Sequence, residues 1–184
     1  MSAESVDTQR LFFALWPASE VRERLAAVAR EHAARPVLER NLHLTLVFLG
    51  ECSATQRACF SAAASAIESP RFSLSLDFLG GRIRTKIQWL ASSETPQALR
   101  DLVEKLHEAL GPCGFEPERR RFLAHVTLSR KARKPAVRAL ADPVIWPVDS
   151  FALMASEPAP GGVRYRLLEC WPLANFETAE TGAT

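Results

Sequence analysis

The sequence predicts a two-lobed α+β protein in which antiparallel sheets flank a central groove and helices lie outside. Strand-like and helix-like segments do not alternate regularly, which argues against a doubly wound parallel sheet. In addition, each half of the chain carries one His-x-Thr segment, beginning at His43 and at His125. We therefore expect residues 1–184 to form a single bilobal domain whose motif strands face each other across the groove.

Apolar patterning and turn residues define the elements of the first half. Pro17 closes an apolar segment, Gly50 closes a second one, and Ser53 with Gln56 resembles a capping box. The expected elements are a strand over 11–16, a helix from about residue 19, a strand over 42–49 and a helix over about 54–67.

The second half has sharper turn signals. Gly80-Gly81 separates two strand-like segments, Thr95-Pro96 is a favourable helix start, and Gly111-Pro112 ends the helical stripe. The expected elements are strands over 72–78 and 82–90, a helix to about 110, a strand over 122–129, a short helix near 135–141, and strands near 148–154 and 163–171. The polar segment 177–184 is expected to be a frayed tail.

The composition is that of an ordinary globular protein, with 47% hydrophobic and 24% charged residues. The four cysteines form no C-x-x-C pair, so we expect reduced thiols in the cytoplasm. The N-terminus lacks the pattern of a signal peptide, and no apolar run approaches the roughly 18 residues of a membrane span. The expectation is a cytoplasmic monomer with no membrane partner.

Basic residues are concentrated around the second motif, although the net charge of the chain is only +2. The only acidic residues among them are Glu116 and Glu118. A local cluster of this kind suits an anionic, phosphate-bearing ligand, and a solvated loop is the alternative. The basic residues are Arg119, Arg120, Arg121, Arg130, Lys131, Arg133 and Lys134.

The two motifs can each present an imidazole beside a hydroxyl, because residues i and i+2 of a strand point to the same face. One pair is His43 with Thr45, and the other is His125 with Thr127. Two imidazoles can act as acid and base near neutral pH. No acidic residue adjoins either motif, so a metal site is not expected. Ser129 has the spacing to share the same face, but no sequence feature marks it as an activated nucleophile.

Phosphodiester cleavage is the reaction that best fits these groups. In-line displacement at phosphorus needs a base on the attacking oxygen and an acid on the leaving oxygen. Two lobes that each contribute one histidine can supply this geometry. The threonine hydroxyls can donate hydrogen bonds to phosphate oxygens, and Arg130 is the nearest cation that could bind the phosphate.

These motifs resemble those of the 2H phosphoesterase superfamily, specifically the bacterial and archaeal RNA 2′,3′-cyclic phosphodiesterases, also called 2′-5′ RNA ligases. The resemblance covers nearly the whole chain. One departure is Ala124, where relatives usually carry Pro before the second histidine. The matching segments are RLFFALWP, NLHLTLVFLGE, RRFLAHVTLSR, GVRY and CWPL.

The resemblance implies hydrolysis of 2′,3′-cyclic phosphate ends of RNA or oligonucleotides to 2′-phosphomonoesters, without a metal or other cofactor. It makes His43 the general acid and His125 the general base. Thr45, Thr127 and Arg130 would then bind the phosphate. The reverse direction, 2′-5′ ligation of RNA ends, is a second enzymatic hypothesis, and a non-catalytic RNA-end binding module is the alternative from another class.

The sequence gives weaker evidence that other aromatic and imidazole side chains belong to the site. Phe12 could line the groove or pack in the core, and Tyr165 could supply a hydroxyl or a stacking surface to the substrate. His32 and His107 lie on expected helices outside both motifs, so we expect structural roles for them. The four tryptophans are expected in the core or at the lobe interface.

Overall fold

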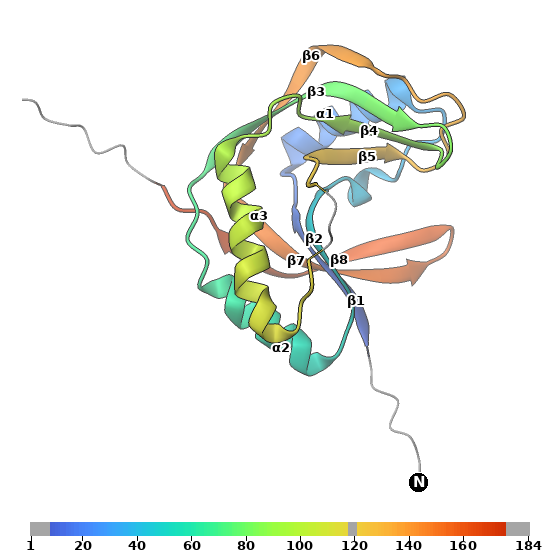
Figure 1. Ribbon diagram of the computed structural model, residues 1–184. Coiled ribbons are helices and arrows are strands. Elements are labelled where there is room, and N and C mark those ends of the chain that lie inside the picture. The colour runs from blue at the N-terminus through green and yellow to red at the C-terminus, as the bar shows by residue number, and fades with distance from the viewer. Residues whose placement is uncertain (1–7, 118–120, 176–184) are drawn as a thin grey trace, which may run out of the picture.

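Eight strands form one antiparallel sheet in the order β6-β3-β4-β5-β2-β1-β7-β8 in the computed structural model, which describes residues 8–117 and 121–175 (Figure 1). The strands are β1 (Gln9–Leu15), β2 (Leu44–Cys52), β3 (Phe72–Arg82), β4 (Ile87–Ala91), β5 (His125–Ser129), β6 (Arg138–Val148), β7 (Ser150–Ala159) and β8 (Gly162–Pro172). The helices are α1 (Ser19–His32), α2 (Ala54–Ser65) and α3 (Gln97–Leu110), with short 3-10 turns η1 (Glu39–Asn41) and η2 (Gly111–Cys113).

The sheet consists of two four-stranded lobes that meet at its middle. One lobe is β6-β3-β4-β5 and the other is β2-β1-β7-β8. The lobes join where β2 meets β5, through the single antiparallel pair Leu44–Val126. The predicted α+β class with two lobes is therefore confirmed. The expectation that the motif strands face each other across a groove is wrong, because they are direct neighbours in one sheet.

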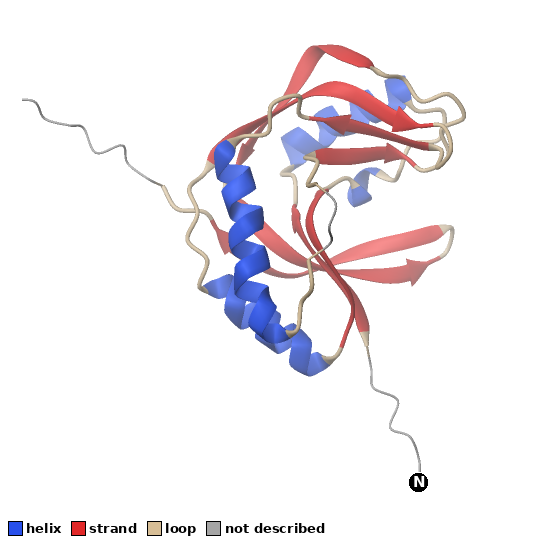
Figure 2. Ribbon diagram, viewed as in Figure 1, coloured by secondary structure: helices blue, strands red, loops and turns tan. Residues whose placement is uncertain are grey.

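Helices cover the lobes unevenly (Figures 1 and 2). Helix α1 lies against the lobe that contains β6, and Arg24 of α1 bonds Asp142 of β6 at 2.8 Å. Helices α2 and α3 lie together beside the other lobe. Ser61 of α2 donates to a carboxylate oxygen of Glu169 on β8 at 2.6 Å. The helix between β1 and β2 thus packs on the lobe to which neither strand belongs.

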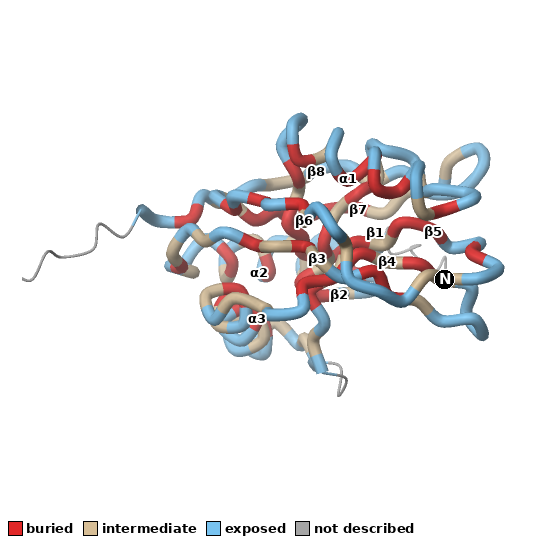
Figure 3. Tube along the Cα trace, turned by 90° about the horizontal axis from the view of Figure 1, so that it is seen from above, coloured by how far each residue is buried: buried red, intermediate tan, exposed pale blue. Residues whose placement is uncertain are grey.

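Apolar residues of the motif strands form the centre of the core. Leu44 and Val126 are fully buried, and Leu46 and Leu128 expose 4% and 0% of their surface. Burying each of these side chains stabilises the fold by about 1.5–3 kcal/mol. Figure 3 shows that the buried stretches gather in the strands at the centre of the molecule.

Two local predictions have clear outcomes. Ser53 and Gln56 form the expected capping box at the start of α2, with both reciprocal hydrogen bonds. The short helix expected near residues 135–141 is wrong, because β6 begins at Arg138. Strand β6 is at the edge of the sheet, where Pro143 and Pro147 can be accommodated without breaking a ladder on both sides.

The prediction of four reduced cysteines is also wrong. Cys59 of α2 and Cys113 of η2 form a disulfide, with their Cα atoms 5.8 Å apart. Cys52 is buried and free, and Cys170 is exposed and free. The two bonded residues are 54 positions apart in sequence. Their pairing depends on α3 returning beside α2, which the spacing of cysteines does not encode.

No helix within the described ranges is long and apolar enough to cross a membrane. The expected frayed tail, 177–184, lies outside those ranges.

We predict that reducing the Cys59–Cys113 disulfide lowers the free energy of unfolding by about 2–4 kcal/mol. The disulfide joins residues 54 positions apart, and without it the unfolded chain has more conformational entropy. Urea unfolding with and without reductant measures this change. The double variant Cys59→Ser/Cys113→Ser should match the reduced protein and should not respond to reductant. Equal stability of oxidised and reduced wild type would contradict the prediction.

Candidate active site

The two His-x-Thr segments lie side by side and antiparallel at the junction of the lobes. Leu44 pairs with Val126. Extending this register by one residue in each direction places His43 opposite Thr127 and Thr45 opposite His125. In both segments the histidine and threonine are half-buried, whereas the residues after them are buried. The structure therefore brings all four motif side chains to one face of the sheet, opposite the core.

Each imidazole is oriented by a backbone carbonyl two residues earlier in the chain. The Nδ1 atom of His43 lies 2.7 Å from the oxygen of Asn41, and Nδ1 of His125 lies 2.8 Å from the oxygen of Leu123. A carbonyl oxygen only accepts, so Nδ1 must carry the proton in both rings. The Nε2 atoms are then left for chemistry. That of His43 accepts from the Thr45 hydroxyl at 3.1 Å when the ring is neutral.

Three aromatic rings surround His43. Tyr165 of β8 meets its imidazole edge-on at 4.7 Å between ring centroids, Phe12 of β1 lies at 5.1 Å, and Trp16 stacks on it at 6.2 Å. Phe12 exposes only 3% of its surface. It therefore supports the histidine ring and leaves little area for a substrate base, whereas Tyr165 is half-buried and reachable.

One aromatic ring lies beside His125. Trp89 of β4 pairs with Thr127 across the sheet, and its ring centroid is 6.1 Å from that of His125. The indole lies across Gly80 of β3, where an added Cβ would come within 2.3 Å of Nε1. Only glycine at this position leaves room for Trp89 to stay in place.

Burial lowers the pKa of both histidines. The pKa of His43 falls to about 4, mainly because desolvation disfavours the charged ring, and the positive charges of Arg130 and His125 add to the effect. Burial and Arg130 also lower the pKa of His125. Both rings are therefore mostly neutral at pH 7 in the free protein. An anion bound beside Arg130 would offset its charge and favour protonation.

Arg130 follows β5 directly and is exposed. Its positive charge lowers the pKa of both imidazoles, so it lies close enough to both rings to affect their protonation. The basic cluster expected from sequence is divided by β5, because Arg121 precedes the strand and Arg130 follows it. Arg119 and Arg120 lie outside the described residues.

Ser129 does not share the face of the motif side chains. It is fully buried, donates to the oxygen of Arg35 at 2.7 Å and accepts from the backbone N–H of Lys131. The pairing of β4 with β5 shifts register between Thr127 and Ser129, which leaves Leu128 as an extra residue in β5. This bulge turns Ser129 away from the face that carries the motif side chains, although its spacing predicts the same face.

The tryptophans divide between site and core. Trp146 is buried and Trp171 packs on Phe151, as expected. Trp16 and Trp89 contact the histidines at the junction of the lobes, which fits the expected lobe interface, but the sequence-based expectation does not include their contact with the site. Side chains alternate along a strand, so the spacing of Phe12 and Trp16 predicts that both lie on one face and could have identified Trp16. His32 and His107 lie on α1 and α3, outside the motif pair.

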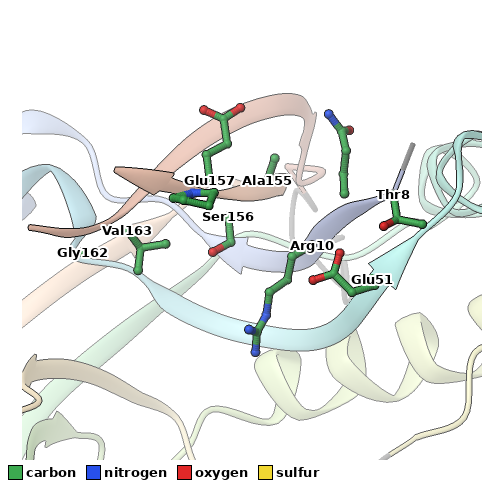
Figure 4. Close-up of a pocket in the computed structure, with 10 residues that line it drawn as sticks. Thr8, Arg10, Glu51, Ala155, Ser156, Glu157, Gly162 and Val163 are labelled. Carbon is green, nitrogen blue, oxygen red and sulfur yellow. The ribbon is translucent and has the colours of Figure 1, made fainter. Parts of the chain in front are cut away.

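A separate hollow of about 590 Å³ lies at the outer ends of β1 and β7 (Figure 4). Its lining residues include Arg10, Glu51, Ser156 and Glu157 but neither motif histidine.

Within residues 8–117 and 121–175, no three His, Cys, Asp or Glu side chains are grouped to hold a metal ion.

The model of the 2′-5′ RNA ligase superfamily matches residues 16–159. The chain belongs to this superfamily. It is 38% identical to the RNA 2′,3′-cyclic phosphodiesterase of Escherichia coli, over 91% of this chain and 98% of that protein. It is 33% identical to the protein of the same name from Thermus thermophilus, over 89% and 90% of the two chains. The crystal structure of E. coli LigT complexed with 3′-AMP superposes with a TM-score of 0.84 at 36% identity, covering 92% of this chain and all of the other. The family and fold that the motifs predict are thus confirmed.

We predict that His43 makes the protein sensitive to mild acid. Its pKa is about 4 when folded and near 6.5 when unfolded, so the unfolded chain binds an extra proton between these values. Stability should therefore fall as pH decreases from 6.5 towards 4, by about 1–2 kcal/mol at pH 5 from this group.

Urea unfolding of wild type and His43→Gln at pH 7.5 and pH 5 tests this coupling. The difference at pH 7.5 gives the packing cost of the substitution, and the variant should lose less stability between the two pH values. Equal losses would contradict the lowered pKa.

Proposed function

We propose that the protein hydrolyses 2′,3′-cyclic phosphate ends of RNA or oligonucleotides to 2′-phosphomonoesters by acid–base catalysis with His43 and His125, without a metal. One observation carries the proposal most directly. Two imidazoles with the same tautomer lie on one face of the sheet, each beside a threonine of the opposite motif. Relatives of nearly equal length are named RNA 2′,3′-cyclic phosphodiesterases.

The reaction needs proton transfer at two opposite oxygens. His125 removes a proton from water, the water oxygen attacks phosphorus, and the bond from phosphorus to the 3′-oxygen breaks. His43 donates a proton to the departing 3′-oxygen, and the 2′-ester bond remains. The proton gained by His125 is returned to solvent, and His43 is protonated again before the next cycle. The antiparallel register supports these roles because it separates the rings along the strands.

Three side chains are proposed to bind the phosphate. Thr45 and Thr127 alternate with the histidines and can donate to the non-bridging oxygens. Arg130 can offset the negative charge of the attacked phosphate. Tyr165, which is half-buried beside His43, is proposed to contact the terminal nucleotide, with Phe12 behind it.

Substrate binding is proposed to adjust the proton affinity of the acid. In the free protein the pKa of His43 is about 4, so few molecules hold the proton that an acid must donate. A cyclic phosphate diester carries one negative charge. Placed beside Arg130, this charge offsets the positive charge of Arg130 and attracts the protonated ring, so it raises the pKa of His43. We therefore expect the high-pH limb of the pH profile, where the acid loses its proton, to lie higher for kcat than for kcat/KM.

The same groups can promote 2′-5′ ligation if the 5′-hydroxyl of a second RNA replaces water as the nucleophile. The match to the 2′-5′ RNA ligase superfamily model favours this second activity. A non-catalytic RNA-end binding module is disfavoured, because such a module does not need two oriented imidazoles with free Nε2 atoms. Incubating a cyclic-phosphate RNA with a 5′-hydroxyl RNA separates the three outcomes: hydrolysis, ligation or binding alone.

We predict that an oligonucleotide ending in 2′,3′-cyclic phosphate is converted to the 2′-phosphomonoester in the presence of EDTA. Chromatography of the product against 2′- and 3′-phosphate standards measures this. His43→Ala and His125→Ala should each reduce kcat by about 100- to 10,000-fold, because each removes one proton-transfer group. His107→Ala is the matched control, and its kcat should stay near that of wild type. Activity that disappears in EDTA and returns with one divalent metal would overturn the mechanism.

A further inference from the structure

The β3–β4 turn and the chain that follows β5 form one basic surface, which we call the basic rim. Arg82, Arg84 and Lys86 lie in or beside the turn, and Arg130, Lys131, Arg133 and Lys134 follow β5. All seven are exposed. Figure 1 shows the turn and the end of β5 at the same end of one lobe. We propose that this rim binds the phosphate backbone of RNA on the 5′ side of the cyclic end. This proposal rests on the proposed function.

The two segments of the rim are fixed to each other by specific contacts. The backbone N–H of Ala132 donates to the oxygen of Lys86 at 2.9 Å. The side chain of Gln88 is fully buried between them, donating to the oxygens of Gly80 and Ala136 at 2.7 and 2.9 Å. Its oxygen accepts from the backbone N–H of Ala136 at 2.6 Å. The cations are therefore held on a rigid scaffold, which reduces the entropy lost when an anion binds.

No carboxylate interrupts the rim. Neither 82–86 nor 130–138 contains an acidic residue. Among the described residues, no ion pair involves any of the seven cations. A run of unpaired cations attracts a polyanion and releases its condensed counterions on binding. The proposed site uses one of these cations, Arg130, for the attacked phosphate, so the remaining six suit a ligand with several phosphates in a row.

In the corresponding hairpin of the other lobe, a carboxylate is paired with the cations. Arg166 and Arg164 of β8 bond Glu157 of β7 at 2.6 and 3.0 Å. These arginines hold the pKa of Glu157 below its usual range, so its carboxylate stays ionised beside them. The β7–β8 hairpin therefore offers a polyanion much less net charge than the basic rim. The asymmetry predicts that RNA leaves the site over the β3–β4 side.

The test uses the double variant Arg84→Gln/Lys86→Asn, which leaves Arg130 and the motif residues unchanged. Lys86 has a φ of 54°, and asparagine is the non-glycine residue best suited to this conformation. The control is Arg100→Gln/Lys105→Gln on α3, which removes the same charge from an exposed surface beside the other lobe. Substrates are a dinucleotide and a 20-nucleotide RNA, each ending in 2′,3′-cyclic phosphate.

The rim variant should keep the kcat of wild type on the dinucleotide. Its kcat/KM on the long RNA should fall about 3- to 10-fold, and the slope of log kcat/KM against log salt should be shallower by about 0.7–0.9 per lost phosphate contact. The control should match wild type on both substrates. An unchanged kcat/KM on long RNA, or an equal fall in the control, would overturn the proposal.

Equilibrium binding of the same RNA ending in a 2′-phosphate separates this proposal from the proposed reaction, because no turnover is needed. If wild type hydrolyses neither substrate, the proposed function fails. The rim is then judged by binding alone: weaker binding in the rim variant and not in the control supports it, and equal binding in all three proteins overturns it.

Discussion

The pairing of Leu44 with Val126 is the contact on which both the sheet and the site depend. It joins two four-stranded lobes into one sheet, and it sets which motif side chains face each other. Because side chains alternate along a strand, a slip of one residue would bury the histidines and expose the apolar residues between them. The register of β2 against β5 therefore determines both which residues form the apolar core and which form the polar site.

The two motifs are nearly identical in sequence, but their surroundings differ. Three aromatic rings enclose His43, and one lies beside His125. Burial lowers the pKa of His43 to about 4 and also lowers the pKa of His125. Two similar groups in unequal environments are a common basis for separate acid and base roles. Because burial keeps His43 neutral in the free protein, its proposed role as the acid depends on a bound phosphate that raises its pKa.

Local sequence signals predict much of the fold. Alternation of apolar residues identifies the motif strands, and Ser53 with Gln56 marks the start of α2. The features that local signals do not predict depend on contacts between residues that are distant in sequence. The Cys59–Cys113 disulfide requires the return of α3, and β6 tolerates its prolines because it is an edge strand.

The site could be predicted to a similar extent. The spacing of each His-x-Thr segment places the imidazoles and hydroxyls on one face, and the structure brings them together. Ser129 has the same spacing but lies beyond a bulge that depends on pairing with β4. Trp89 reaches His125 only because Gly80 lies across from it. The β3–β4 turn joins the basic residues after β5 through a backbone contact that no sequence pattern indicates.

The central claim is that the two histidines perform different proton transfers on one phosphate. A cyclic phosphate whose bridging 3′-oxygen is replaced by sulfur tests it directly, because a thiolate leaves without needing a proton. Its hydrolysis should be measured with wild type, His43→Ala and His125→Ala. We predict that sulfur restores most of the activity lost in His43→Ala and little of that lost in His125→Ala. Rescue of His125→Ala alone would reverse the roles, and rescue of neither variant would contradict acid–base catalysis by this pair.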